Sequence, residues 1–211
     1  MTDFENQRKQ MVELQLAARN ITSENLLTAF LKVKRELFVP EKLHLASYAD
    51  NPLPIAEEQT ISQPYIVALM IQLLDLKKDD CILEIGTGSG YETALLANLV
   101  DKVYTIELIA KLQHQAKQTL EDQGLTNIEY KIGDGSCGWG QGLKFDKIIV
   151  SAAATKVPEL LITELNDAGI MVIPVGERFN QIITIIKKEN NKVIIQRNYA
   201  CSFVPLKGDY T

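Results

Sequence analysis

The sequence predicts an α/β fold in which helices cover both faces of a mostly parallel central sheet. From residue 81 onward, short runs rich in isoleucine and valine alternate with helical patterns, as in parallel strands that are buried on both faces. The residues before this alternation show helical and loop patterns, and residues 181–199 contain two adjoining β-rich runs. The sequence therefore predicts an N-terminal helical extension, a strand–helix alternation and a closing C-terminal antiparallel hairpin.

The first 50 residues are expected to form helices with short breaks. Apolar residues recur at helical spacing around Met11, Leu14 and Leu16, and Thr22 is the predicted N-cap of the next helix. Residues 50–64 contain three prolines and little periodicity, which predicts an ordered loop. Functional residues often lie in such loops.

The remaining elements follow from the alternating patterns. Five parallel strands are expected, at residues 81–85, 102–106, 128–132, 147–151 and 169–174. Helices are expected before and between them, at residues 65–74, 91–100, 109–123 and 157–165, with Pro158 in the first turn of the last one. Two final strands, 181–188 and 192–199, are joined through Asn190 and Asn191, which tolerate the left-handed conformation that a tight hairpin turn needs.

Length and composition indicate a single globular unit. With 211 residues, of which 46% are hydrophobic, the chain can bury a sizeable core, and its length favours one domain. Within this domain, residues 1–64 are expected to form the helical extension and a substrate loop, and residues 65–211 a cofactor-binding core. The net charge of −5 provides no overall basic field that would neutralise phosphates, so nucleic acid is not an expected partner.

The sequence shows no pattern typical of a membrane span, a secretion signal or a zinc site. No stretch approaches the roughly 18 apolar residues of a membrane span, and no charged region followed by an apolar one opens the chain. The three cysteines, Cys81, Cys137 and Cys201, lie far apart and match no zinc-binding spacing. We therefore expect a cytoplasmic protein with free thiols, no membrane contact and no metal site.

A glycine-rich turn is the most specific local motif. The strand at residues 81–85 runs into Gly86, Gly88 and Gly90 and then into a helix. Glycines allow the chain to turn sharply and let a ligand approach the backbone amides at the helix N-terminus. The spacing differs from the dinucleotide pattern, whose third glycine would fall at Tyr91, and no Gly-Lys-Ser/Thr of a Walker loop follows. The motif therefore indicates another nucleotide-type cofactor.

The pattern Glu-x-Gly-x-Gly-x-Gly, which starts at Glu84 and includes Ser89, resembles that of Rossmann-like class I methyltransferases. Glu107 ends the second strand, 21 residues after Gly86, where an acidic side chain can accept hydrogen bonds from both ribose hydroxyls. Asp134 and Gly135 follow the third strand, and the carboxylate there could accept from an adenine amino group. These strand ends are expected to face one crevice that binds S-adenosylmethionine and, after reaction, S-adenosylhomocysteine.

Motifs along nearly the whole chain, from residue 11 to 206, resemble the protein-L-isoaspartate O-methyltransferase family. The most diagnostic is Thr60-Ile61-Ser62. The others, besides the glycine turn, are Val103-Tyr104-Thr105-Ile106-Glu107, Gly133-Asp134-Gly135, Phe145-Asp146-Lys147-Ile148-Ile149-Val150 with Ala152-Ala153-Ala154, Ile173-Pro174-Val175-Gly176 and Val204-Pro205-Leu206.

The resemblance implies methyl transfer to the α-carboxylate of L-isoaspartyl residues in damaged proteins and peptides, which starts their repair through a succinimide. It also implies that Ser62 is the catalytic residue, and that Thr60, Ile61 and Val204 help to bind the substrate. A free carboxylate with a reference pKa of about 3.5 is already anionic at neutral pH, so no general base is needed. The expected task of Ser62 is to orient the carboxylate, which is catalysis by positioning.

The chain departs from the family where relatives usually have glycines, at Ala56 and Glu58. Lost glycines should stiffen the loop, and the carboxylates of Glu57 and Glu58 should repel an anionic acceptor unless they point outward. Two alternatives remain open at this point: a methyltransferase of the same fold for another carboxylate, in a small molecule or a modified peptide, and a cofactor-binding module without turnover. Thr60 and Ser62 could also simply cap the helix that follows.

Overall fold

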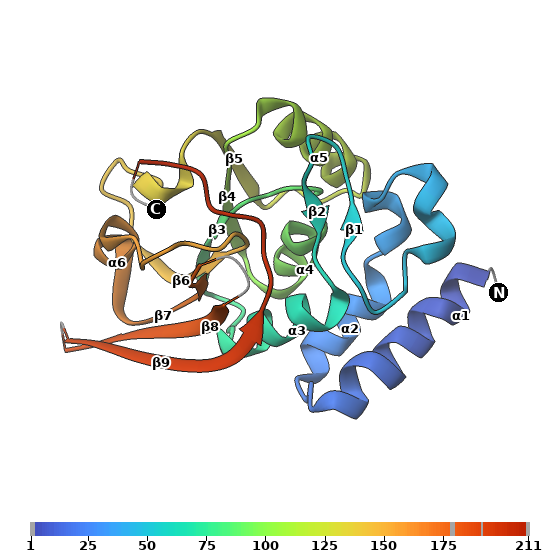
Figure 1. The fold of residues 1–211 in the computed structure, drawn as a ribbon, viewed down its shortest axis with the longest axis horizontal. Coiled ribbons are helices and arrows are strands. Elements are labelled where there is room, and N and C mark those ends of the chain that lie inside the picture. The colour runs from blue at the N-terminus through green and yellow to red at the C-terminus, as the bar shows by residue number, and fades with distance from the viewer. Residues whose placement is uncertain (1–2, 178–179, 191, 210–211) are drawn as a thin grey trace.

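The computed structural model describes residues 3–177, 180–190 and 192–209. Its centre is a seven-stranded sheet with the order β5-β4-β3-β6-β7-β8-β9 (Figure 1). The first five strands in this order are parallel, and the two C-terminal strands are antiparallel to their neighbours. The predicted fold class is thus confirmed.

The five predicted parallel strands are all present. They are β3 Cys81–Ile85, β4 Lys102–Glu107, β5 Ile128–Ile132, β6 Phe145–Val150 and β7 Leu165–Val175. β7 begins earlier than predicted because Leu165 already pairs with Phe145, before a register shift leads to the pair Lys147 and Ile170. The preceding helix is correspondingly shorter, α6 Glu159–Glu164, and Pro158 is its N-cap rather than part of its first turn.

The C-terminal hairpin consists of β8 Gln181–Glu189 and β9 Lys192–Cys201. β8 lies antiparallel to β7, with Met171 opposite Ile186, so the hairpin closes this edge of the sheet as predicted. Asn190 has the left-handed backbone that the turn was expected to need, with a φ of 52°. The second turn residue, Asn191, lies outside the described residues.

The N-terminal extension is helical, as predicted. It comprises α1 Asp3–Gln10, a π-helical turn Met11–Leu16, α2 Glu24–Lys32 and the 3₁₀ turns Ala17–Arg19, Arg35–Phe38 and Glu41–Ala46. The predicted N-cap Thr22 is wrong by one residue, because the Ser23 side chain accepts the hydrogen bond from the Leu26 amide. The Thr22 amide instead donates to Gln72 of α3, at 2.7 Å.

Helices pack on both faces of the sheet, in two hydrophobic layers. The N-terminal helices, α3 Pro64–Leu73, α4 Tyr91–Leu99 and α5 Ala110–Asp122 cover the face that includes Ile82 and Val103. α6 and the C-terminal segment cover the opposite face, which includes Leu83 and Ile106. Neighbouring residues of one strand thus enter different layers, which is why β3 is apolar at four of its five positions when Cys81 is counted as apolar and Glu84 is the exception.

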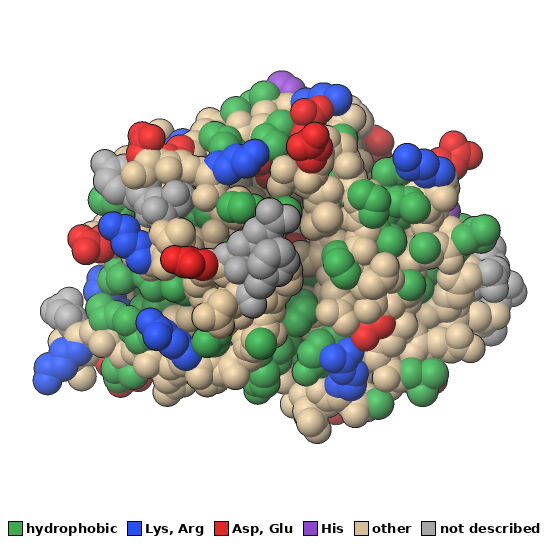
Figure 2. Space-filling model, in the orientation of Figure 1, with side chains coloured by type: hydrophobic (Ala, Val, Ile, Leu, Met, Phe, Trp, Pro, Cys, Tyr) green, Lys and Arg blue, Asp and Glu red, His purple; other side chains and the backbone are tan. Residues whose placement is uncertain are grey.

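Two further features concern the outside of the molecule. On the face shown in Figure 2, acidic and basic side chains are interspersed rather than gathered by sign. Among the described residues, no helix combines the length and apolar character that crossing a membrane requires.

A small antiparallel hairpin replaces the ordered loop expected before α3. β1 Leu53–Pro54 pairs with β2 Thr60–Ile61, and the Gln59 amide donates to the Ala56 carbonyl at 3.1 Å to close the turn. The two central turn residues, Glu57 and Glu58, have φ values of 56° and 57°. Hairpin turns often require positive φ at both central residues, which glycine or asparagine adopts far more easily than glutamate.

Glu58→Gly is therefore expected to raise the free energy of unfolding by about 1 kcal/mol, because it relieves a left-handed backbone that disfavours side chains. Urea denaturation measures the change. Ala56→Gly is the matched control: Ala56 is not among the residues with positive φ, so this variant should lose stability through added chain entropy. A loss of stability in Glu58→Gly as large as in the control would contradict the prediction.

Candidate active site

The candidate site is an open pocket at the carboxyl ends of β3, β4 and β6. It has about 850 Å³ of empty space, solvent at its mouth included, and the β1–β2 hairpin and the segment after β9 complete its wall. The strand order reverses between β3 and β6, since the chain continues from β3 to β4 on one side and returns to β6 on the other. In open α/β sheets this crevice is the usual ligand site.

The glycine turn forms the floor between β3 and α4. Gly86 and Gly88 line the pocket with φ values of 96° and 53°, which side-chain-bearing residues rarely adopt. The Gly86 amide donates to the Ile106 carbonyl at 2.8 Å, which ties the turn to the end of β4. Ser89 also lines the pocket at the start of α4.

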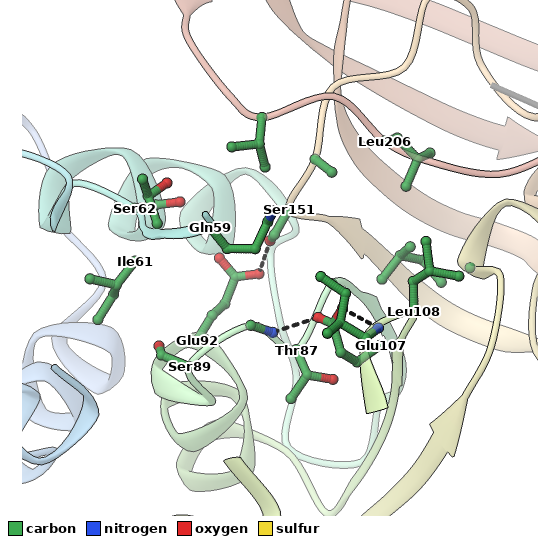
Figure 3. A pocket seen from close by; sticks show the side chains of 18 of the residues that line it. Gln59, Ile61, Ser62, Thr87, Ser89, Glu92, Glu107, Leu108, Ser151 and Leu206 are labelled. Carbon is green, nitrogen blue, oxygen red and sulfur yellow. Dashed lines mark hydrogen bonds between the residues drawn. The ribbon is translucent and has the colours of Figure 1, made fainter. Parts of the chain in front are cut away.

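Glu107 holds the turn and faces the pocket. Its two carboxylate oxygens accept hydrogen bonds from the Gly88 and Ile109 amides, each at 2.9 Å (Figure 3). A carboxylate has about four acceptor positions, so two remain for hydroxyl groups of a ligand. Because Glu107 is fixed on both sides and lines the pocket, the site fits the ribose of a nucleoside cofactor.

The predicted substrate residues line the same pocket. Thr60, Ile61 and Ser62 reach it from β2 and the turn that follows, and Val204 reaches it from the C-terminal segment. Ser62 does not cap α3, whose N-cap is Gln63 without a side-chain hydrogen bond. No hydrogen bond of the Ser62 hydroxyl is present within the described part of the chain, so this group is available to a ligand.

A second depression meets the pocket at Ser62. The two share Thr60, Ser62, Ser151 and Val204, and the second one continues outward along residues 200–203. Ser62 therefore lies between the cofactor crevice and the surface. A large acceptor such as a peptide could approach along this depression while its reacting group enters the pocket.

The comparisons with known proteins agree with this geometry. The family model for protein-L-isoaspartate(D-aspartate) O-methyltransferase matches residues 6–211. The chain belongs to this family. A protein-L-isoaspartate O-methyltransferase of Petrotoga mobilis is 53% identical over 99% of both chains, and one of Trichlorobacter lovleyi is 49% identical over 99% of this chain and 96% of its own.

Solved structures give the same family. A protein-L-isoaspartate O-methyltransferase structure superimposes with a TM-score of 0.85 at 27% identity, covering 96% of this chain and 67% of the other. A second one, from Plasmodium falciparum in complex with S-adenosyl-L-homocysteine, has a TM-score of 0.82 at 26% identity and covers 95% and 98%. S-Adenosylmethionine is thus the cofactor of this family member, as predicted.

Two residues predicted to contact the cofactor lie beneath the pocket rather than in its wall. Glu84 is fully buried, and its carboxylate accepts from the hydroxyls of Thr93 and Thr105, both at 2.6 Å. Burial, together with the nearby charge of Glu92, raises the pKa of Glu84 well above its usual value. In this position Glu84 supports the turn from below, and its direct contact with the cofactor stays a prediction.

Gly90 has a packing role as well. It is the N-cap of α4, with a φ of 87°, and a β-carbon there would lie 3.1 Å from the side chain of Ala116. Gly90 thus allows α4 to pack closely on α5. Gly90 lies outside the pocket wall, and its direct contact with the cofactor stays a prediction.

The two residues predicted at the end of β5 have different surroundings: one lines the pocket and the other contacts the C-terminal segment. Gly135 lines the pocket, as predicted, but Asp134 does not. The Asp134 carboxylate accepts from Ser136 and from the Asp209 amide, at 2.8 Å each. Burial raises the pKa of Asp134, but hydrogen bonds from Asp209, Ser136 and Cys137 lower it more, so the group stays ionised. In this structure Asp134 fastens the C-terminal segment, and its contact with an adenine stays a prediction.

Ser151 and Glu92 are among the pocket residues that were not predicted from the sequence. Ser151, directly after β6, donates a hydrogen bond to Glu92 in the first turn of α4, at 2.5 Å. Both line the pocket (Figure 3). Burial raises the pKa of Glu92 to about 7, although the Ser151 hydrogen bond acts in the opposite direction. An acidic residue two positions after Gly90 was the sequence signal that could have identified Glu92.

The acidic turn of the hairpin points outward. Glu57 and Glu58 are both exposed and neither lines the pocket. Glu57 forms an ion pair with Lys111 of α5, at 2.7 Å. The repulsion of an anionic acceptor considered from the sequence is therefore not built into the pocket wall. Among the residues that the structure describes, no cluster of metal-binding side chains occurs.

Proposed function

We infer that this family member transfers the methyl group of S-adenosylmethionine to the α-carboxylate of L-isoaspartyl residues in damaged proteins and peptides. One observation carries the assignment: the Thr60-Ile61-Ser62 segment and the glycine turn, which belong to different parts of the chain, line a single pocket. Relatives that are 45–53% identical over nearly their whole length are protein-L-isoaspartate O-methyltransferases.

The cofactor supplies an electrophilic methyl group on a positively charged sulfur. The residues of the chain have to hold the acceptor carboxylate so that one oxygen faces this methyl. We assign the Ser62 hydroxyl to the second carboxylate oxygen, because a hydrogen bond to the reacting oxygen would weaken the nucleophile. The acceptor is anionic at neutral pH, so the chain does not need to remove a proton.

Apolar side chains form part of the pocket wall near Ser62. Ile61, Val204 and Leu206 line the pocket, and Ile61 and Leu206 are buried. Exclusion of water strengthens the hydrogen bonds that orient the acceptor. The amide of Leu206 donates to the Ala153 carbonyl at 2.8 Å, and the Ala153 amide to the Val204 carbonyl at 2.9 Å. These bonds fix the C-terminal segment as part of the wall.

The decisive experiment uses labelled S-adenosylmethionine and two peptides that differ only in isoaspartate or aspartate at one position. We expect base-labile label, the property of a methyl ester, on the isoaspartyl peptide alone. Equal labelling of both peptides would show that the site does not select the isoaspartyl carboxylate. If the cofactor binds and neither peptide is labelled, another carboxylate acceptor or a binding module without turnover would replace the assignment.

We extend the proposal to the setting of the reaction. The partners would be isoaspartyl proteins and peptides, without nucleic acid or membrane, and the compartment the cytoplasm. Support comes from the three cysteines, Cys81, Cys137 and Cys201, which are all free thiols. Free thiols are typical of proteins in a reducing compartment.

A further inference from the structure

Glu92 is the carboxyl group of the pocket that the reaction described above leaves without a role. It is only 9% exposed and its side chain points from the first turn of α4 toward Ser151, on the side of the pocket where Gln59 and Ser62 lie (Figure 3). Its Oε1 atom accepts the hydrogen bond from the Ser151 hydroxyl. None of the ion pairs between described residues includes Glu92.

The two ends of the pocket place the reacting centre near Glu92. Glu107 marks the ribose end at β4, and Ser62 marks the acceptor end. The methyl group must be delivered to an oxygen held at Ser62, so the sulfur that carries it belongs on the Ser62 side of the pocket. Glu92 lies on this side, whereas both oxygens of Glu107 are already bound by backbone amides.

We propose that ionised Glu92 is the counter-ion of the sulfonium group and makes the site prefer the methyl donor to S-adenosylhomocysteine. This inference rests on the proposed function and names a specificity-determining residue for it. The two ligands share the adenosine and amino-acid parts and differ in one methyl group and one positive charge. A carboxylate within a few ångströms of that charge distinguishes them by Coulomb attraction, which is stronger in a buried site than in water.

The surroundings of Glu92 suit a group that changes its charge when the ligand binds. Burial brings its pKa to about 7, so it is partly neutral in the free protein at neutral pH. Glu84 of β3 interacts electrostatically with Glu92 from beneath, and the other charged or titratable residues in the pocket wall are Glu107, Tyr91 and the exposed Lys207. A cationic ligand should therefore favour ionised Glu92 and release a proton on binding.

The same charge explains how the product could leave. Methyl transfer breaks the carbon–sulfur bond and forms a carbon–oxygen bond, and the bonding electron pair stays on sulfur. Glu92 then no longer faces a positive charge, and its raised pKa favours uptake of a proton from solvent. The site loses the interaction that held the donor, while the other contacts to the product stay as they were.

Binding measurements without an acceptor test the proposal. Titration calorimetry would compare Glu92→Gln with the unaltered protein for S-adenosylmethionine, for sinefungin, which carries an amino group in place of the sulfonium, and for S-adenosylhomocysteine. We expect about tenfold weaker binding of the two ligands that are cationic at this position, and S-adenosylhomocysteine within about twofold. Glutamine retains the size and an acceptor for Ser151, and Glu92→Asp should restore part of the preference.

The exposed residue Glu13, which is outside the pocket wall, provides the control Glu13→Gln with the same change in charge. It should bind all three ligands normally. In the unaltered protein the affinity for S-adenosylmethionine should rise with pH through about 7, because the ionised form of Glu92 binds better. The α-amino group of the ligand titrates with both proteins, so the difference between them and Glu92→Gln isolates Glu92.

Three results would overturn the proposal. Equal weakening of all three ligands would mean that Glu92 contacts the amino-acid part that they share. Unchanged binding in Glu92→Gln, or an affinity that falls as pH rises through 7 in the unaltered protein alone, would mean that neutral Glu92 is the binding form. The two proposals can fail separately. If neither peptide is labelled but the unaltered protein still prefers the cationic ligands, the proposed function is contradicted and the role of Glu92 remains supported.

Discussion

Glu107→Ala is expected to lower the affinity for S-adenosylmethionine about hundredfold. The variant removes both acceptors for the ribose hydroxyls and leaves the Gly88 and Ile109 amides without their partners. Hydrogen bonds to a charged group contribute about 1.5–3 kcal/mol each. We therefore expect the binding free energy of S-adenosylmethionine to become less favourable by about 3 kcal/mol. Titration calorimetry measures the affinity, and thermal unfolding shows whether the variant remains folded.

Two further variants make this result specific. Glu107→Gln retains one carbonyl acceptor and should show an intermediate loss. Glu129→Ala removes an exposed carboxylate from β5 together with its ion pair to Lys102, and should leave cofactor affinity within twofold because exposed pairs contribute little. A loss of less than threefold in Glu107→Ala would show that Glu107 only shapes the turn and does not bind the ribose.

The sequence alone predicted the structure correctly where the interactions that determine it are local. Short runs rich in isoleucine and valine predicted the parallel strands, and the start and end of β3 and β5 were predicted correctly. The glycine turn was recognised because positive φ at Gly86 and Gly88 is a property of single residues. Of the cofactor residues predicted from local motifs, Gly86, Gly88 and Glu107 line the pocket, whereas Glu84 and Gly90 of the same glycine motif lie outside its wall.

The sequence alone did not predict contacts between residues that lie far apart along the chain. Glu92 and Ser151 are 59 positions apart and meet only because β6 lies beside β3. Asp134 and Asp209 are 75 positions apart, and their contact adds a structural role for Asp134 that the sequence did not indicate. Periodicity identifies strands but not which strands become neighbours, so neither contact could be read from local patterns.

The β1–β2 hairpin was missed for a different reason. Its turn contains Glu57 and Glu58, whereas the sequence signal for a two-residue hairpin turn is asparagine or glycine at these places. Backbone hydrogen bonds close this turn nevertheless: the Gln59 amide donates to the Ala56 carbonyl, and the Ile55 amide donates to the Gln59 carbonyl. The same hairpin carries Thr60 and Ile61 into the pocket, so the least predictable element positions the most diagnostic motif.

Ser62→Ala is expected to lower methylation of an isoaspartyl peptide at least tenfold and to leave the affinity for S-adenosylmethionine within threefold. The hydroxyl is available to the acceptor, and Ser62 lies where the cofactor pocket meets the outer depression. A hydrogen bond to a carboxylate contributes about 1.5–3 kcal/mol, and each 1.4 kcal/mol lost only in the transition state lowers the rate about tenfold. Initial rates of base-labile labelling measure the effect.

The separation of rate from binding is what identifies Ser62 as a residue that positions the acceptor. Ser62→Thr, which retains a hydroxyl, should recover part of the activity, whereas the exposed Thr126, outside both depressions, provides a control in Thr126→Ala that should react normally. Activity of Ser62→Ala equal to that of the unaltered protein would refute the assignment. A parallel fall in cofactor affinity would instead indicate that removal of the hydroxyl disturbs the β1–β2 hairpin and with it the whole pocket wall.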